Sequence, residues 1–304
     1  MKDLLKIKKE FTKIAGDRYK ENISLSKYTS FNTGGLAEHF ICPKDVDEVK
    51  SVYEVSNSFG VPVFILGRGT NTLISDDGFR GVVISTENLN NIYVEDNIVV
   101  CESGVSIASL LKTTLSTSLK GIEFMVGIPG TLGGAVISNA GLKNIWISHL
   151  LKEIGILYLN NLKTGVLLKD DINFGYRISG LENVFVYKVV LVLEKSDKKE
   201  IQNTINCYMK KRGNCLHPEG FSAGSIFKNP ENHFAGKLIE EAGLKGFSVG
   251  GAKVSEKHAN FIINTGSATS AEIYSLLVLV QKKVKQLFNI SLEPEIKIIG
   301  NFDK

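Results

Sequence analysis

The chain has 304 residues, an apolar fraction of 43% and a charged fraction of 22%, which exclude a disordered chain, a collagen and a coiled coil. Its net charge of +4 is too small and too dispersed to indicate nucleic-acid binding. No apolar run approaches the roughly 18 residues of a membrane span, and the charged N-terminus lacks the apolar core of a signal peptide. We therefore expect a cytoplasmic protein that binds neither nucleic acid nor membrane.

Glycine and arginine usage are the unusual features of the composition. There are 29 glycines, where an average usage of about 7% gives about 21. Twelve lie between Gly60 and Gly141, which indicates tight turns or a close approach of backbone to a ligand. Only five of the 36 basic residues are arginines, so each one is a candidate for planar, bidentate recognition. The four cysteines show no CxxC spacing, so we expect neither a metal site nor a disulfide framework.

The first elements in chain order indicate a mixture of helix and strand. Residues 1–30 are typical of a lysine-rich helix followed by an extended lead-in. Asp45 and Glu48 are spaced as in a capping box, and valines at helical spacing follow, which predicts a helix that ends at Gly60. The apolar run 63–66 predicts a buried strand directly before a glycine-rich loop.

The middle of the chain is rich in short strands. Apolar runs at 92–94 and 98–100 flank three turn-forming residues and predict a hairpin. Residues 106–115 predict a short amphipathic helix. Further strands are expected near 154–159, 165–168 and 184–193, with a hairpin near Asn160-Asn161 that implies antiparallel pairing.

The last third begins at a boundary near Ser196. A helical face follows at Ile201 and Ile205, and Thr269 with Glu272 opens a helix over 271–287. Residues 290–299 predict a closing strand. This order of elements indicates an α+β fold.

Two glycine-rich loops are candidates for binding a dinucleotide. The first follows a predicted strand directly, but it has Thr72 where the dinucleotide fingerprint needs a third glycine. The second has four glycines in eight residues. Each alone is compatible with a simple structural turn, whereas two in one region favour a nucleotide whose phosphates lie against backbone amides. The candidate residues are Gly67, Arg68, Gly69, Thr70, Asn71 and Thr72 in the first loop, and Gly127, Ile128, Pro129, Gly130, Thr131, Gly133, Gly134, Ala135 and Asn139 in the second.

Three further positions are candidates for catalysis, each with a plainer alternative. Arg177 follows Tyr176 between two predicted strands and is suited to holding a carboxylate or enolate, although an isolated arginine is more often a surface ion pair. Ser225 lies among small residues before Lys228 and Asn229, and could donate a proton or be structural. Glu293 and Glu295 share one face of the predicted last strand, which could also be an exposed edge because of Pro294.

Taken together, these stretches resemble the UDP-N-acetylenolpyruvoylglucosamine reductase (MurB) family of flavoenzymes. Each motif is short, and their order along the chain makes the resemblance specific. The stretches are 29–35, 67–71, 121–124, 127–141, 176–177, 222–230, 242–246, 255–261 and 293–300.

The resemblance implies a fold of three parts. It implies a lead-in over 1–30, an FAD-binding domain of the PCMH type (vanillyl-alcohol-oxidase-like) over 31–196, with subdomains at about 31–84 and 85–196, and an α+β substrate-binding domain over 197–304. Only 47 residues separate Arg177 from Ser225, so the chain resembles the second, more compact subtype.

The resemblance also implies the activity. NADPH, as co-substrate, would reduce non-covalently bound FAD, and hydride would pass to the β-carbon of the enolpyruvyl group of a UDP-sugar, giving UDP-N-acetylmuramate for peptidoglycan synthesis, cell shape and cell division. Ser225 matches the family's proton donor, and Arg177 and Glu295 match its other two catalytic positions. Tyr176, Lys228 and Asn229 would contact the substrate. We expect a monomer.

Some residues depart from the family pattern, and other functions stay open. Members of the family often carry Gln-Pro and a further proline before the Ser-Ala-Gly-Ser run, whereas residues 216–221 here are Leu-His-Pro-Glu-Gly-Phe. Lys297 stands where arginine is common. The choice of Glu295 over Glu293 rests on the resemblance. The alternatives are another PCMH-type FAD oxidoreductase acting on a small alcohol or sugar, and a non-enzymatic nucleotide-binding module.

Overall fold

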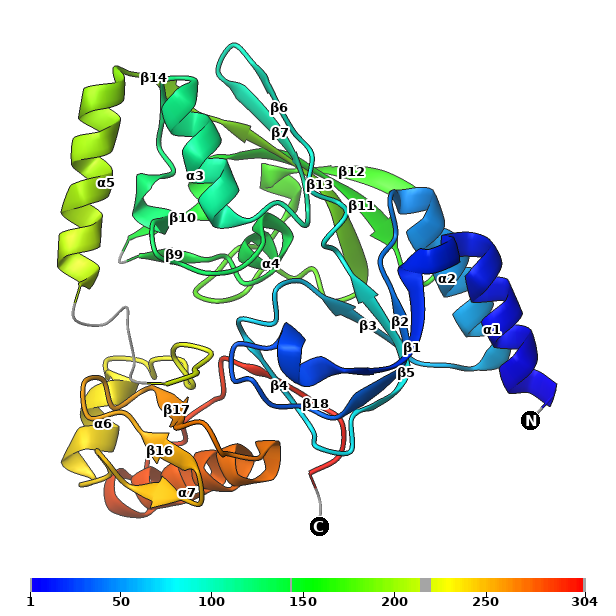
Figure 1. Cartoon of the computed structure of the whole chain (residues 1–304). Coiled ribbons are helices and arrows are strands. Elements are labelled where there is room, and N and C mark those ends of the chain that lie inside the picture. Colours follow the sequence, from blue (N-terminus) through cyan, green and yellow to red (C-terminus); the bar gives the residue numbers. More distant parts are fainter. Residues whose placement is uncertain (1, 143, 214–219, 303–304) are drawn as a thin grey trace. The chain divides into compact units, whose positions relative to one another are not determined.

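The structure is a computed structural model that describes residues 2–142, 144–213 and 220–302 (Figure 1). The chain forms two compact units. The first comprises Met1–Lys20, His39–Gly67 and Gly81–Arg212, and the second comprises Glu21–Glu38, Arg68–Arg80 and Gly213–Lys304. These units divide the chain at residues other than 30 and 196. The predicted domain boundaries at 30 and 196 stay a prediction.

A five-stranded antiparallel sheet forms the centre of the first unit. Its order is β12-β11-β13-β7-β6, and the two predicted hairpins, β6–β7 and β11–β12, are confirmed. Helix α3 buries Ile107, Leu110 and Leu111 in the same hydrophobic core as the sheet, at the spacing of one helical face. The strands are β6 (Ile92–Glu95), β7 (Ile98–Glu102), β11 (Leu151–Tyr158), β12 (Thr164–Leu168) and β13 (Val184–Val192), and the helices of this part are α3 (Ile107–Ser116), α4 (Leu132–Ile137) and α5 (Lys198–Arg212).

A second, four-stranded sheet has the order β1-β2-β5-β3, and its last two strands are parallel. Helices α1 and α2 pack side by side (Figure 1) and share a core with Val82 and Ile84 of β5. The expected strand 63–66 is confirmed as β3, but only its last residue, Leu66, is buried, so the predicted full burial is wrong. The elements are α1 (Lys2–Ala15), β1 (Tyr19–Ser24), β2 (Leu36–Ile41), α2 (Val46–Phe59), β3 (Val63–Leu66) and β5 (Phe79–Ser85).

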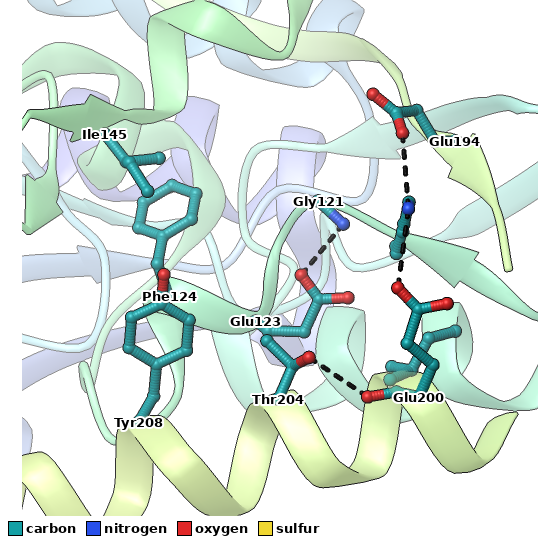
Figure 2. Close-up of a pocket in the computed structure, with 10 residues that line it drawn as sticks. Gly121, Glu123, Phe124, Ile145, Glu194, Glu200, Thr204 and Tyr208 are labelled. Atoms are coloured by element: carbon teal, nitrogen blue, oxygen red, sulfur yellow. Dashed lines mark hydrogen bonds and ion pairs between the residues drawn. The ribbon is translucent and has the colours of Figure 1, made fainter. Parts of the chain in front are cut away.

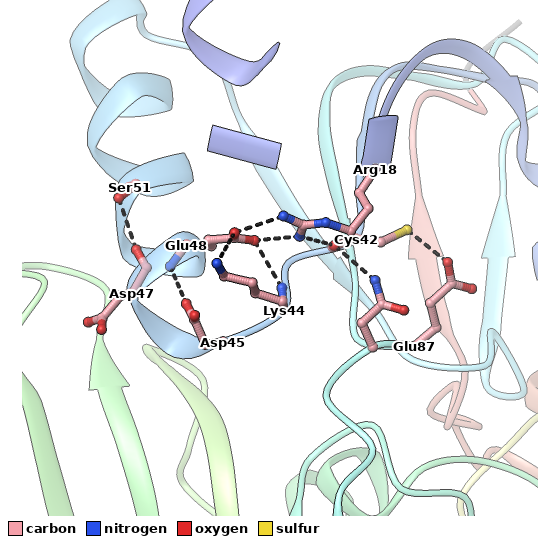
Figure 3. A network of polar contacts seen from close by, with 9 residues as sticks. Arg18, Cys42, Lys44, Asp45, Asp47, Glu48, Ser51 and Glu87 are labelled. Carbon is pink, nitrogen blue, oxygen red and sulfur yellow. Dashed lines mark hydrogen bonds and ion pairs between the residues drawn. The ribbon is translucent and has the colours of Figure 1, made fainter. Parts of the chain in front are cut away.

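The start of α2 departs from the predicted capping box. The Asp45 side chain accepts from the Glu48 backbone N–H at 2.8 Å, as expected of an N-cap. The Glu48 carboxylate instead accepts from both terminal nitrogens of Arg18, at 2.5 and 2.8 Å, and from the Lys44 backbone N–H (Figure 3). A partner distant in sequence thus replaces the second half of the box, because a bidentate ion pair is stronger than a bond to one neutral N–H.

The C-terminal part of the second unit packs helices against a small antiparallel sheet. The capping box at the start of α7 is complete: Thr269 accepts from the Glu272 N–H, and Glu272 accepts from the Thr269 N–H. The predicted helix is confirmed, and it buries Ile273, Leu276 and Leu277 along one face. The elements are α6 (Ala235–Glu241), β15 (Ser248–Val249), β16 (Ala252–Val254), β17 (Ile262–Asn264) and α7 (Ser270–Phe288).

The closing strand expected over 290–299 is wrong for most of its length. Only β18 (Lys297–Ile299) is a strand, and it pairs in parallel with β4 (Thr72–Ile74). Pro294, which lacks a backbone N–H, allows only an isolated bridge to Phe227 before that. Glu293 and Glu295 are therefore not two positions of one regular strand.

The remaining elements are short and connect the larger ones. They are β8 (Leu119–Lys120), β9 (Gly141–Leu142), β10 (Ile145–Trp146), β14 (Glu194–Lys195), and the 3-10 turns η1 (Gly16–Arg18), η2 (Leu25–Tyr28), η3 (Glu123–Met125), η4 (Ile147–His149) and η5 (Lys169–Asp171). Among the described residues, no helix combines the length and apolar character that crossing a membrane requires. The same part of the chain holds no group of three or more His, Cys, Asp or Glu suited to a metal ion.

Candidate active site

The two predicted glycine loops meet within the first unit at Gly67. This residue follows β3 directly, and a Cβ at its position would lie 2.8 Å from Thr131 Oγ1. Thr131 in turn is the N-cap of α4, where its hydroxyl accepts from the Gly134 N–H at 3.3 Å. The absence of a side chain at position 67 is what allows the end of β3 to approach the second loop.

The second loop presents glycine backbone at the surface. Gly127 and Gly130 have φ angles of 74° and 131°, which residues with side chains rarely adopt. Gly127 and Pro129 are exposed. Gly133 lies so close to Ser103 that a Cβ would approach it to 2.7 Å. A stretch of exposed backbone with small or no side chains fits a flat ring system or a diphosphate, so these residues fit the predicted FAD.

The rest of the first loop lies in the second unit. Gly69 lies against the backbone of Tyr28, with a φ of 58°. The side-chain amide of Asn71 donates to the Glu295 carbonyl at 3.1 Å, and the Asn71 carbonyl accepts from the Lys297 N–H. Asn71, predicted to bind cofactor, therefore also holds the backbone of a predicted catalytic residue.

Arg177 occupies a tight turn in the first unit. Gly175 and Ile178 bond each other across the turn, and Arg177 itself has a φ of 57°. A left-handed backbone conformation costs an arginine about 1 kcal/mol or more, and such strained residues cluster at active sites and ligand-binding sites. The turn is held by the Asn139 amide, which donates to the Gly175 carbonyl at 3.0 Å, and by the Ser179 hydroxyl, which donates to the Ile137 carbonyl. Asn139, predicted for FAD, thus links the glycine loop to Arg177.

Aromatic rings and a second arginine accompany Arg177. Its guanidinium lies 5.9 Å from the ring centre of Tyr176, and Trp146 contacts Tyr176 edge-on. Arg212, at the end of α5, donates to the Phe124 carbonyl at 3.0 Å. Burial, and after it the positive charge of Arg177, lowers the pKa of Arg212. Two guanidinium groups that repel each other in this way favour an anion between or beside them.

Arg212 is the functional candidate that sequence analysis missed. Its only signal was the scarcity of arginine, since the residue matches no motif and ends a lysine-rich helix. Its relation to Arg177 depends on the packing of α5 against η3, which joins residues far apart in the chain.

Ser225 and Glu295 come together in the second unit. The Glu295 N–H donates to the Ile226 carbonyl at 2.7 Å, and the Lys228 N–H donates to the Glu293 carbonyl at 2.9 Å. Both predicted catalytic side chains are half-buried. The structure therefore places the segments that carry these two residues side by side, although 69 residues lie between them in the sequence.

The neighbouring polar side chains have defined partners. Lys228 forms an ion pair with Glu293 at 2.6 Å. The Asn229 side-chain oxygen accepts from the Ala235 N–H at the start of α6. Within the predicted segment 216–221, residues 216–219 lie outside the described residues.

The first unit has a pocket of about 320 Å³ (Figure 2). It is lined by Phe124 and Tyr208 on one side, and by Lys120 paired with Glu194 at 3.6 Å and with Glu200 at 3.5 Å. None of the predicted site residues lines it. Its lining holds one lysine against the three carboxylates of Glu123, Glu194 and Glu200, so it does not suit an anionic ligand.

Comparisons with known proteins place the chain in a family. Residues 37–147 match a family model described as an FAD binding domain. Residues 217–299 match one described as the C-terminal domain of UDP-N-acetylenolpyruvoylglucosamine reductase. Over 286 residues the chain is 42% identical to the UDP-N-acetylenolpyruvoylglucosamine reductase of Clostridium novyi (strain NT), with 93% of each chain covered. The chain belongs to the UDP-N-acetylenolpyruvoylglucosamine reductase family.

Solved structures agree with this family and with the expected fold. The UDP-N-acetylenolpyruvylglucosamine reductase (MurB) of Thermus caldophilus superposes with a TM-score of 0.78 at 30% identity, covering 91% of this chain and 98% of that one. The glucose dehydrogenase Phl p 4.0202 superposes with a TM-score of 0.52 at 13% identity, over 64% of this chain and 44% of its own. The second likeness shows the fold alone. The predicted PCMH-type FAD-binding fold, joined to a C-terminal domain of the reductase family, is confirmed.

Proposed function

We propose that this member of the reductase family reduces UDP-N-acetyl-3-O-(1-carboxyvinyl)-glucosamine to UDP-N-acetylmuramate with NADPH, through bound FAD, as a step of peptidoglycan precursor synthesis. The observation that carries the proposal is the 42% identity to the Clostridium novyi reductase over 93% of both chains. The matched FAD-binding and C-terminal domains, which together supply cofactor and substrate binding, support it.

We assign the FAD to the surface that Gly67 and the loop 127–135 form in the first unit, and residues 68–72 stay a prediction from the sequence. Bound FAD supplies the means of passing hydride from NADPH to the double bond. The chain contributes backbone without side chains: Gly127 and Gly130 have positive φ angles in the loop, and Gly67 lets the end of β3 pack against Thr131.

Reduction of the enol ether adds a hydride to its β-carbon and a proton to its α-carbon, while NADPH becomes NADP⁺. We assign the proton to the hydroxyl of Ser225, which recovers one from solvent after each turnover. The negative charge that develops on the carboxylate and α-carbon is stabilised by the guanidinium of Arg177, a planar donor that cannot lose its charge. Glu295 is the third residue of this set, and its backbone is fixed by Ile226 and Asn71.

The remaining polar groups suit an anionic UDP-sugar. We propose that Tyr176, Lys228 and Asn229 contact the sugar or the diphosphate, and that Arg212 adds positive charge near Arg177. Lys228 would exchange its exposed partner Glu293 for the substrate, at a small cost, because surface ion pairs contribute about 0–1 kcal/mol.

The alternative of an alcohol or sugar oxidase has less support. The glucose dehydrogenase covers only 64% of this chain, at an identity that speaks for the fold alone. That alternative does not explain why residues 217–299 match the C-terminal domain of the reductase family. The compact subtype, a monomeric state and a cytoplasmic location stay predictions.

The experiment that tests the function follows flavin absorbance in two stages. The purified protein, loaded with FAD, should lose its yellow colour with NADPH and regain it with the enolpyruvyl-UDP-sugar. In stopped-flow absorbance, Ser225→Ala should keep the first stage and slow the second about 10²–10⁴-fold, as is typical when a general acid is removed. Ser248→Ala, an exposed serine of β15, is the control and should leave both stages unchanged. Failure of the wild type to regain colour would exclude the proposed substrate, and equal loss of both stages in Ser225→Ala would exclude the role of Ser225.

A further inference from the structure

The segment that carries Ser225 has its backbone groups bonded on both sides. On one side Ser225 forms a bridge to Phe261, and the Ile226 N–H donates to the Asn260 carbonyl at 2.9 Å. On the other side the Ile226 carbonyl accepts from Glu295, and the Lys228 N–H donates to the Glu293 carbonyl. The segment therefore lies in the second unit like a short central strand between two neighbours.

Phe227 faces Pro294 across an isolated bridge, but its own N–H and carbonyl groups are bonded by a side chain. The Phe227 N–H donates to the Asn260 Oδ1 at 3.0 Å, and the Asn260 Nδ2 donates to the Phe227 carbonyl at 2.8 Å. A carboxamide has one acceptor and one donor in the spacing of a peptide group, so this pair imitates a backbone bridge. Asn260 is only 4% exposed, and Phe227 only 2%. Both hydrogen bonds are thus shielded from water, and an unmet partner at either end would be costly.

The consequence for Ser225 is geometric. Asn260 fixes Phe227, two residues after Ser225, and the carbonyl of Ile226 between them receives the N–H of Glu295. A shift or rotation of the segment Ser225–Lys228 therefore moves Ser225 and the backbone of Glu295 together. Misplacement by about 1 Å costs up to about 10²-fold in rate when a group must lie within reach of a reacting carbon.

We propose that Asn260 is a positioning residue for the proton transfer assigned to Ser225. It contacts neither the substrate nor the cofactor in this assignment and acts only through the segment Ser225–Lys228. The inference rests on the proposed function, because it takes Ser225 as the proton donor.

The chain provides a matched control at Asn264. This asparagine is 2% exposed and ends β17, four residues after Asn260. Its amide donates to the Phe31 carbonyl at 2.8 Å, and its oxygen accepts from the Gly266 and Ala268 N–H groups. The Asn264 side chain thus makes the same kind of hydrogen bonds to backbone groups as Asn260, but these bonds fix segments other than Ser225–Lys228.

The experiment compares Asn260→Ala with Asn264→Ala in the FAD-loaded, full-length protein. Thermal unfolding should show similar losses of stability in the two variants, since each leaves buried backbone groups unmet. In stopped flow, both should be reduced by NADPH at the wild-type rate. Reoxidation by the enolpyruvyl-UDP-sugar should slow about 10–100-fold in Asn260→Ala only, with a larger solvent deuterium isotope effect because proton transfer becomes more rate-limiting.

A double variant tests whether Asn260 acts through Ser225. In the Ser225→Ala background the proton donor is already absent, so Asn260→Ala should slow reoxidation by no more than about twofold further. Asn260→Ser, which adds no charge and keeps a hydroxyl that can bond one of the two backbone groups, should fold where the alanine variant does not and should slow reoxidation to a smaller extent.

The outcomes distinguish a failure of the proposed reductase function from a failure of the positioning role of Asn260. Wild-type protein that is not reoxidised by the substrate would overturn the proposed function. If wild type is reoxidised and Asn260→Ala or Asn260→Ser is as fast, or if the effects of Ser225→Ala and Asn260→Ala multiply, the positioning role is wrong.

Discussion

The turn at Gly175–Ile178 and the segment Ser225–Lys228 hold their proposed catalytic side chains by different means. In the turn, Arg177 adopts a left-handed backbone, and single side-chain hydrogen bonds from Asn139 and Ser179 fix the flanking chain. In the segment, backbone groups bond two neighbouring segments, and Asn260 adds a side-chain bridge. We expect the turn to depend strongly on each of its few side-chain bonds. In the segment, the backbone bonds should make most single side chains dispensable, and Asn260, which bonds both backbone groups of Phe227, is the exception.

The largest effect is expected from Arg177 itself. Arg177→Ala should lower the rate of reoxidation by the substrate about 10²–10³-fold, because a fixed donor to developing negative charge is lost. Arg177→Lys should recover only part of the rate, since a point charge cannot replace the planar fork. Stopped-flow absorbance with NADPH as the control stage measures both. A lysine variant as fast as the wild type would show that charge alone is needed at the turn.

A smaller effect distinguishes the two ways of holding a residue. Asn139 and Gln281 each donate one amide hydrogen bond to a carbonyl shortly before a proposed catalytic residue, Gly175 before Arg177 and Leu292 before Glu295. Asn139→Ala should slow reoxidation about tenfold, while Gln281→Ala should change it less than about threefold, because backbone bonds still hold Glu295. Steady-state and stopped-flow rates of the two variants measure this difference. Equal effects would remove the distinction between turn and segment.

The smallest effect concerns the strain in the turn. Arg177→Gly and Arg177→Ala both remove the guanidinium, but only glycine adopts a φ of 57° freely. The glycine variant should therefore be more stable than the alanine variant by about 1 kcal/mol, measured by denaturant unfolding with FAD present. If alanine is equally stable, the left-handed backbone at Arg177 is not strained, and the turn is held no less tightly than the segment.

Local signals in the sequence predicted many of the elements correctly. The helix opened by Thr269 and Glu272 and the hairpin of β6 and β7 form as expected, because capping boxes, helical spacing and turn residues act within a few residues of one another. The closing strand over 290–299 failed, because its state depends on the distant segments that pair with it.

The candidate site was predicted unevenly for the same reason. Gly67 and Thr131 were singled out as separate loops, and folding brings them into contact. Arg212 and Asn260 were not predicted as site residues, since a half-buried arginine near the charge of Arg177 and an amide facing Phe227 exist only after packing.

The sequence by itself determined the family of this protein, its α+β composition and the residue types its chemistry needs, because these are carried by short motifs and their order. The tertiary structure decided how those residues are held. It set a left-handed turn under Arg177, paired the segments of Ser225 and Glu295, and gave Asn260 a partner 33 residues away. Such contacts depend on burial and on hydrogen bonds between distant segments, which no local pattern specifies.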